Sequence, residues 1–96
     1  MNNRPLELEM PPFATSEPSA VEVLRVWVVP GKGHQLSLRT KWADPGAWGL
    51  LLADVARHAA KAYANDGLDE TEAFARVRLL LEAEFARPTD DPKQLA

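Results

Sequence analysis

The sequence predicts an α+β domain in which a β-hairpin packs on two antiparallel helices, in the order β-β-α-α. Three observations support this fold class. Two segments rich in β-branched and aromatic residues flank a Gly-Lys-Gly triplet, a pattern typical of a hairpin. Two longer segments with helical apolar spacing follow, and each begins at an aspartate. Finally, a chain of 96 residues has room for only one domain.

The hairpin is expected within residues 22–42, where apolar and polar side chains alternate on both sides of Gly31–Gly33. A three-residue loop at these positions brings the apolar faces of both strands to the same side, whereas a loop of two residues would oppose apolar and polar faces. The three-residue loop also predicts that Arg25 lies directly opposite Arg39. Like charges in that arrangement destabilise a ladder unless something negative lies nearby.

The first helix is expected to begin at Asp44, because aspartate is a good N-cap and proline, here Pro45, suits the first helical position. It should end near Tyr63, since Asn65 and Gly67 supply stop signals. Its polar residues cover only part of the circumference. We therefore expect this helix to be covered on more than one side.

The second helix is expected to begin at Asp69, with Glu72 three residues later as in a capping box, and to end before Pro88. It carries one apolar stripe at helical spacing, which we expect to be buried. The stripe consists of Phe74, Val77, Leu81 and Phe85.

Prolines mark the two ends of the chain. Residues 1–20 are predicted to form a proline-rich arm and residues 88–96 a polar tail, which leaves residues 21–87 as a single α+β domain. Within the arm, residues 6–10 (LELEM) alternate and could add an edge strand to the hairpin. A disordered acidic arm is the favoured alternative, because prolines closely flank the segment.

The composition limits how such a small core can be stabilised. The chain has no cysteine, so it has no disulfide and no cysteine-based zinc site, and self-association is the remaining means. No apolar run has the length of a signal peptide or of a membrane span. We therefore expect a cytoplasmic protein without a membrane partner.

The segment from Trp42 to Tyr63, together with the preceding hairpin, resembles a small family of uncharacterised proteobacterial proteins known only as a domain of unknown function. The most specific element is a Trp-x-Asp-Pro-Gly-x-Trp-Gly motif within residues 42–49. The resemblance covers roughly Ala20 to Arg87 and implies one folded unit. It implies no activity, because none is established for the family.

Few residues are arranged for chemistry, and we assign no catalytic, cofactor-binding or metal-binding residue. Asp54 and His58 are four residues apart and can meet on one helix face, either as a plain surface pair or as part of a metal or acid–base site. Trp42 and Trp48 flank the turn before this helix and are expected to belong to the core, with a ligand pocket as the alternative.

Charge is distributed unevenly along the chain. Residues 1–24, 25–43 and 44–96 carry net charges of −3, +4 and −4, which together give the −3 of the whole chain. The basic stretch predicts an interaction surface on one hairpin face. Its candidate residues are Arg25, Trp27, Val29, Arg39 and Lys41.

Three functions are compatible with these features. A non-enzymatic homodimeric protein-interaction or regulatory module is favoured, because the core is small and the first helix is widely apolar. The alternative is a small-molecule or metal-binding protein or enzyme, with a site near Trp42, Trp48, Asp54 and His58. The least favoured is a single-stranded nucleic-acid binder using the basic face, since the whole chain is acidic and its own carboxylates can pair with that face.

Overall fold

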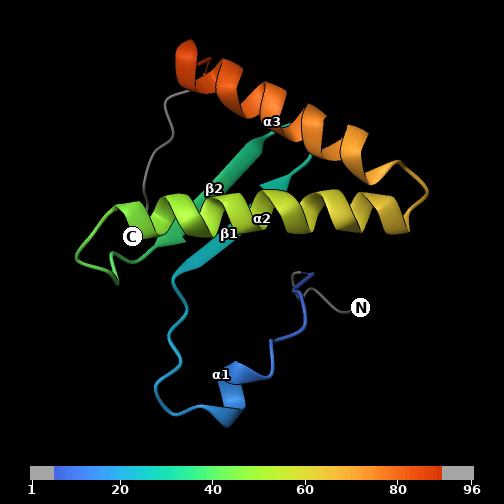
Figure 1. Ribbon diagram of the computed structural model, residues 1–96. Helices are drawn as coiled ribbons and strands as arrows, with labels where there is room; N and C mark the ends of the chain where they lie inside the picture. The colour runs from blue at the N-terminus through green and yellow to red at the C-terminus, as the bar shows by residue number, and fades with distance from the viewer. Residues whose placement is uncertain (1–5, 90–96) are drawn as a thin grey trace. The chain divides into compact units, whose positions relative to one another are not determined.

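The computed structural model describes residues 6–89 (Figure 1). One unit contains the described residues up to Arg39, and the other begins at Thr40, so the two are described separately. The elements are α1 (Phe13–Ser16), β1 (Leu24–Val29), β2 (Gly33–Leu38), α2 (Gly46–Asn65) and α3 (Glu70–Ala86). A hairpin followed by two long helices confirms the predicted α+β class and the β-β-α-α order.

The hairpin turns at Pro30-Gly31. The Lys32 N–H donates to the Val29 carbonyl over 2.8 Å, which closes a β-turn with proline and glycine at its centre. Gly31 has a φ of 83°, as the third position of a type II turn requires. Pairing then begins with Val29 opposite Gly33, so the loop consists of Pro30, Gly31 and Lys32.

The predicted register was wrong by two residues. Arg25 lies opposite Ser37 and not opposite Arg39. The cause is the turn: Pro30 and Gly31 occupy its centre, and Gly33 joins the ladder instead of the loop. A shift of two preserves side-chain alternation, so each residue still lies on the predicted face of the hairpin.

The arm contains no strand in its described part. β1 and β2 make a two-stranded sheet, and residues 6–10 are not paired with it. The sequence did not predict α1, a single turn at Phe13–Ser16 in which the Glu17 N–H donates to the Phe13 carbonyl over 3.1 Å.

α2 begins one residue later than predicted, with Pro45 in the N-cap place, and the Asp44 carboxylate still holds its first turn. The Asp44 carboxylate accepts the Gly46 N–H over 2.8 Å, and the Asp44 carbonyl accepts the Ala47 N–H over 3.1 Å. A Cβ on Gly46 would lie 3.2 Å from Asp44 Oδ1, closer than ordinary van der Waals contact. Glycine therefore makes room for the capping carboxylate at this position.

The end of α2 lies where the sequence predicts it. Gly67 adopts a φ of 104°. The Gly67 N–H donates to the Ala64 carbonyl and the Leu68 N–H to the Tyr63 carbonyl, each over 3.1 Å. These two bonds form a Schellman motif, in which a left-handed glycine satisfies carbonyls that the helix leaves free.

The ends of α3 are both held by side-chain hydrogen bonds. The Asp69 carboxylate accepts the Glu72 N–H over 2.9 Å, as the predicted cap requires. At the other end, the Glu84 carboxylate accepts the Thr89 N–H over 2.9 Å and also the Thr89 hydroxyl. Residues beyond Ala86 thus turn back onto the last turn of the helix. Neither long helix of the described chain has an apolar stretch sufficient to cross a membrane.

The two helices approach each other near the loop that joins them and diverge with distance from it (Figure 1). Ala60 on α2 and Ala73 on α3 are buried, with only 1% and 7% of their surfaces exposed, and they are the only residues so buried in the described chain. Small side chains let two helices approach closely. The expected burial of the whole α3 stripe was wrong, because Leu81 is exposed and Phe85 exposes 73% of its surface.

Candidate functional site

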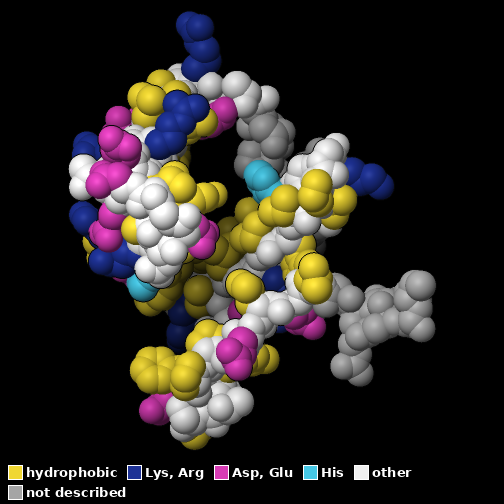
Figure 2. All heavy atoms as spheres, turned by 90° about the vertical axis from the view of Figure 1, so that its right-hand side faces the viewer, with side chains coloured by type: hydrophobic (Ala, Val, Ile, Leu, Met, Phe, Trp, Pro, Cys, Tyr) yellow, Lys and Arg dark blue, Asp and Glu magenta, His cyan; other side chains and the backbone are white. Residues whose placement is uncertain are grey.

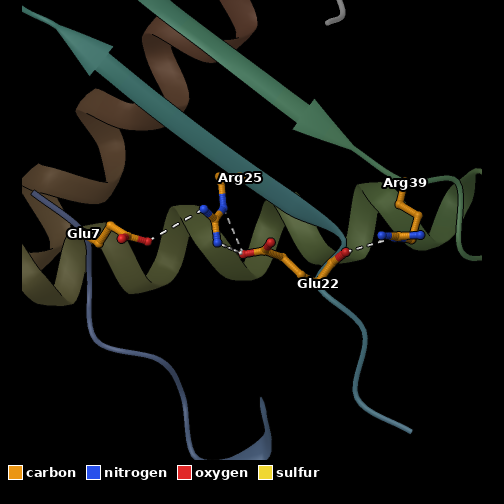
Figure 3. A network of polar contacts seen from close by, with 4 residues as sticks. All are labelled: Glu7, Glu22, Arg25 and Arg39. Atoms are coloured by element: carbon orange, nitrogen blue, oxygen red, sulfur yellow. Dashed lines mark hydrogen bonds and ion pairs between the residues drawn. The ribbon is translucent and has the colours of Figure 1, made fainter. Parts of the chain in front are cut away.

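The basic face of the hairpin carries a polar network that joins two arginines through Glu22 (Figure 3). Arg25 donates from Nε and Nη2 to the Glu22 carboxylate over 3.3 and 3.1 Å. Its Nη1 also lies 3.7 Å from the Glu7 carboxylate in the arm. Arg39 donates from Nε to the backbone carbonyl of Glu22 over 3.2 Å.

This network places two carboxylates of the same chain beside Arg25, although the Arg25–Arg39 pairing that led us to expect a nearby negative charge is not formed. All three ion-paired side chains are substantially exposed, so each pair contributes at most about 1 kcal/mol. The pairing also reduces the charge that Arg25 can offer to a nucleic-acid phosphate.

An open hollow of about 610 Å³ lies at this end of the hairpin. Its lining comes from the strand ends and from the network, as Glu22, Val23, Leu24, Arg25, Ser37, Leu38 and Arg39. Trp27, half-buried, and Val29, exposed, continue the face along β1. Lys41, the remaining residue of the predicted surface, belongs to the other unit.

Trp42 and Trp48 pack against each other beside the turn that starts α2. Their ring centroids are 5.9 Å apart and their planes meet at 81°, an edge-to-face arrangement. Such a pair is worth about 0.5–1.5 kcal/mol beyond its buried area. Trp42 exposes 40% of its surface and Trp48 is half-buried, so the rings pack on each other without being buried in a core.

Asp54 and His58 meet on α2, with His58 Nε2 3.5 Å from Asp54 Oδ2. Both side chains are exposed. Residues 6–89 contain no group of three or more metal-ligating side chains that could add to the pair. Asp54 follows Trp48 by six residues and so lies about 120° away around the helix, which separates the pair from the tryptophans.

The end of the helix pair nearest the loop, which we call the closed end, is held by contacts between α2 and α3. The Arg57 guanidinium lies over the Phe74 ring, 5.2 Å from its centroid, and Lys61 Nζ lies 3.5 Å from Glu70. Charged side chains of both signs gather around this end in Figure 2. Sequence reasoning missed both contacts, because neither pair is at a helical spacing and only the fold brings them together.

The opposite end of the helix pair, which we call the open end, exposes large apolar side chains. They come from the first half of α2 and the second half of α3, away from the region where the helices meet. The set consists of Leu50, Leu52, Leu80, Leu81 and Phe85. Leu50 and Leu52 lie about 200° apart around α2, so the set is a group of exposed apolar side chains at one end of the helix pair and not a single face.

Comparisons with known proteins identify a family. The sequence profile of the domain of unknown function DUF5076 matches residues 7–89, so the match includes most of the arm as well as the hairpin and helices. No curated protein matches the sequence. A solved structure from the photosynthetic bacterium Rhodopseudomonas palustrus CGA009, described as a proposed pyruvate dehydrogenase, is 38% identical, with a TM-score of 0.81 over 99% of this chain and 98% of that chain. The chain belongs to the DUF5076 family of domains of unknown function.

Proposed function

We propose that this protein is a non-enzymatic protein-interaction module that works as a homodimer, with the open end of one helix pair covered by the open end of a second copy. The observation that carries the proposal is the exposure of the five apolar side chains at that end, Phe85 above all. Burial of such side chains is the main favourable contribution to association.

A second copy suits the open end better than an unrelated occupant for a geometric reason. A two-fold axis brings the same end of both copies together, so the exposed apolar side chains of one copy meet those of the other. Two helical hairpins placed face to face make a four-helix arrangement, in which each helix buries its apolar stripe against neighbours. The apolar stripe of α3 would then be buried along its whole length.

The need for such a partner follows from what stabilises the chain. With two alanines as the buried residues of the described part and no cysteine anywhere, neither a large core nor a disulfide contributes. Small domains in this position commonly depend on oligomerisation. The absence of cysteine is also compatible with the cytoplasmic location that we propose.

We propose no pyruvate dehydrogenase activity for this chain. The residues considered for chemistry are an edge-to-face tryptophan pair and an exposed Asp–His pair on a different side of the helix. Neither arrangement combines a nucleophile, a base and a protected pocket, as catalysis would require. We therefore propose interaction and not catalysis as the function.

Sedimentation equilibrium tests the dimer. The wild type is expected to sediment with twice the chain mass of 10.6 kDa at about 100 µM and to dissociate on dilution. The double change Leu81→Glu, Phe85→Glu should yield a monomer, since it introduces charge on both sides of a two-fold interface. Leu79→Glu on the opposite side of α3 is the matched control and should leave the dimer intact.

A wild-type chain that remains a monomer at about 100 µM would overturn the proposal. Equal effects of the changes at Leu79 and Phe85 would likewise contradict the assignment of the interface to one side of α3.

A further inference from the structure

The arm segment, residues 6–10, has the pattern of a strand but no strand partner. Leu6 and Leu8 expose 98% and 97% of their surfaces. Glu7 of this segment forms an ion pair with Arg25 on β1 (Figure 3). The family match begins at residue 7 and therefore includes residues 7–10 of this segment.

The outer edge of β1 is open in the described chain. The Arg39 N–H donates to the Val23 carbonyl across the hairpin, and residues of an antiparallel strand alternate between facing the partner strand and facing away. Leu24, Val26 and Val28 therefore direct their N–H and C=O groups away from β2. An unpaired edge of this kind is a template for an added strand.

We propose that residues 6–10 of one chain add as an outer strand to β1 of a second copy. The proposal rests on the homodimer proposed above and deepens it. Glu7 of one copy would then pair with Arg25 of the other copy. This pair would replace the ion pair that Glu7 and Arg25 form within a single chain. The hairpins would thereby become three-stranded, and a two-stranded ribbon alone is only marginally stable in water.

The side-chain pattern fits this edge on both faces at once. With Glu7 on the face of Arg25, strand alternation puts Glu9 on the same face, toward the basic side chains. The same alternation puts Leu6, Leu8 and Met10 on the other face, which already carries Leu24, Val26 and Val28. A slip by one residue would exchange the two sets, so the pattern fixes the pairing.

The segment that connects the arm to β1 favours exchange between copies over pairing within one chain. Pro11 and Pro12, α1 and Pro18 lie between the arm and β1 and restrict the path of the chain. Within one chain, Glu7 reaches Arg25 while the backbone of residues 6–10 makes no ladder. The arm of a second copy approaches β1 without this restriction.

Disulfide cross-linking tests the exchange directly, because the chain has no cysteine of its own. Chains carrying Leu8→Cys are mixed with chains carrying Leu24→Cys or Val26→Cys and then oxidised. A covalent dimer is expected from one of the mixtures, and which one forms reports whether the added strand is antiparallel or parallel. Glu7→Cys is the matched control and should not cross-link, since its side chain lies on the opposite face.

Amide hydrogen exchange provides a second readout that needs no change in β1. In the wild-type dimer, the Leu24, Val26 and Val28 amides should exchange at least about tenfold more slowly than in Leu8→Pro, because proline breaks the added strand. The Arg25 and Trp27 amides face β2 and should be unaffected. Unchanged exchange of the edge amides in Leu8→Pro would overturn the proposal.

Charge reversal gives a third result. Glu7→Lys should weaken dimerisation about threefold to tenfold, and Arg25→Glu in the same chain should restore it, whereas Glu17→Lys should have little effect. A wild-type monomer would contradict both the homodimer and the exchange. A wild-type dimer whose cysteine variants form no covalent dimer on oxidation would contradict the exchange alone.

Discussion

The two ends of the α2–α3 pair differ in the burial and in the contacts of their side chains. At the closed end, Ala60 and Ala73 let the helices approach, and polar contacts such as Arg57 over Phe74 surround them. At the open end, the helices diverge and leucine and phenylalanine side chains remain exposed. The closed end contains the buried residues of the described chain, although Tyr63 and Leu68 near it are exposed, whereas the open end leaves its leucine and phenylalanine side chains uncovered.

Under the homodimer proposed above, the closed end contributes to the folding of one chain and the open end to the association of two chains. Changes at the closed end should alter the folding of the helix pair, because its contacts are made within the chain. Changes at the exposed apolar side chains of the open end should alter association and leave the folding of a single chain nearly untouched. Two substitutions test this division, and two further ones test the hydrogen bonds at the start of α2 and at the end of α3.

Phe85→Ala should have the largest effect, which is a weakening of dimerisation. Each two-fold interface loses the burial of two phenylalanine side chains, worth roughly 1.5–3 kcal/mol each, so the dissociation constant should rise at least about a hundredfold. The stability of the dilute monomer should change by less than about 0.5 kcal/mol. Sedimentation and dilute thermal unfolding measure the two quantities, and a large loss in the monomer would show that Phe85 is buried within one chain.

Ala60→Leu should destabilise the helix pair itself. Extra methylenes at this close approach force the helices apart, at a cost of roughly 1–3 kcal/mol in the free energy of unfolding. Ala62→Leu on an exposed side of the same helix is the control and should be nearly silent. Urea unfolding compares the two, and equal effects would mean that the helices do not meet at Ala60.

Asp44→Ala should cost about 1 kcal/mol of stability, because the Gly46 N–H loses its capping carboxylate. Asp44→Asn retains an oxygen acceptor and should recover most of the loss. Thermal unfolding of the three proteins is sufficient. A loss that Asn fails to recover would show that the charge matters and not the hydrogen bond.

Thr89→Val should have the smallest effect, confined to the end of α3. Hydrogen bonds from the Thr89 hydroxyl and N–H lower the pKa of the Glu84 carboxyl. Because the folded pKa lies below the unfolded one, this contact stabilises the chain above the unfolded pKa and is lost as the pH falls through the folded pKa. In Thr89→Val, the pKa of Glu84 should rise toward that of an ordinary glutamate, as a carboxyl NMR titration would show.

The elements that the sequence predicted correctly depend on local signals. Asp44, Gly67 and Asp69 act on backbone groups a few residues away, so their effects can be read without the fold. The hairpin faces were predictable for the same reason, since alternation is local. The register was not, because a shift by two keeps every face and only the Pro30-Gly31 turn decides it.

The features that the sequence could not predict involve residues that lie far apart in the chain. The contacts of Arg57 with Phe74 and of Lys61 with Glu70 need the angle between two helices. The exposure of Phe85 is a further case, because its spacing matches that of a buried stripe and only the divergence of the helices leaves it uncovered. Of the predicted basic surface, the network around Arg25 was anticipated in kind, but the choice of Glu22 and Glu7 as its partners was not.

The most direct measurement is the reactivity of a thiol at the open end as a function of protein concentration. Leu81→Cys introduces the only cysteine of the chain, and Asp66→Cys in the loop at the closed end is the control. Between about 1 µM and 100 µM, the labelling rate of Leu81→Cys should fall severalfold as a second copy covers it, while that of Asp66→Cys stays constant. A Leu81→Cys rate that is equally fast at both concentrations would contradict the claim that a second copy covers the open end.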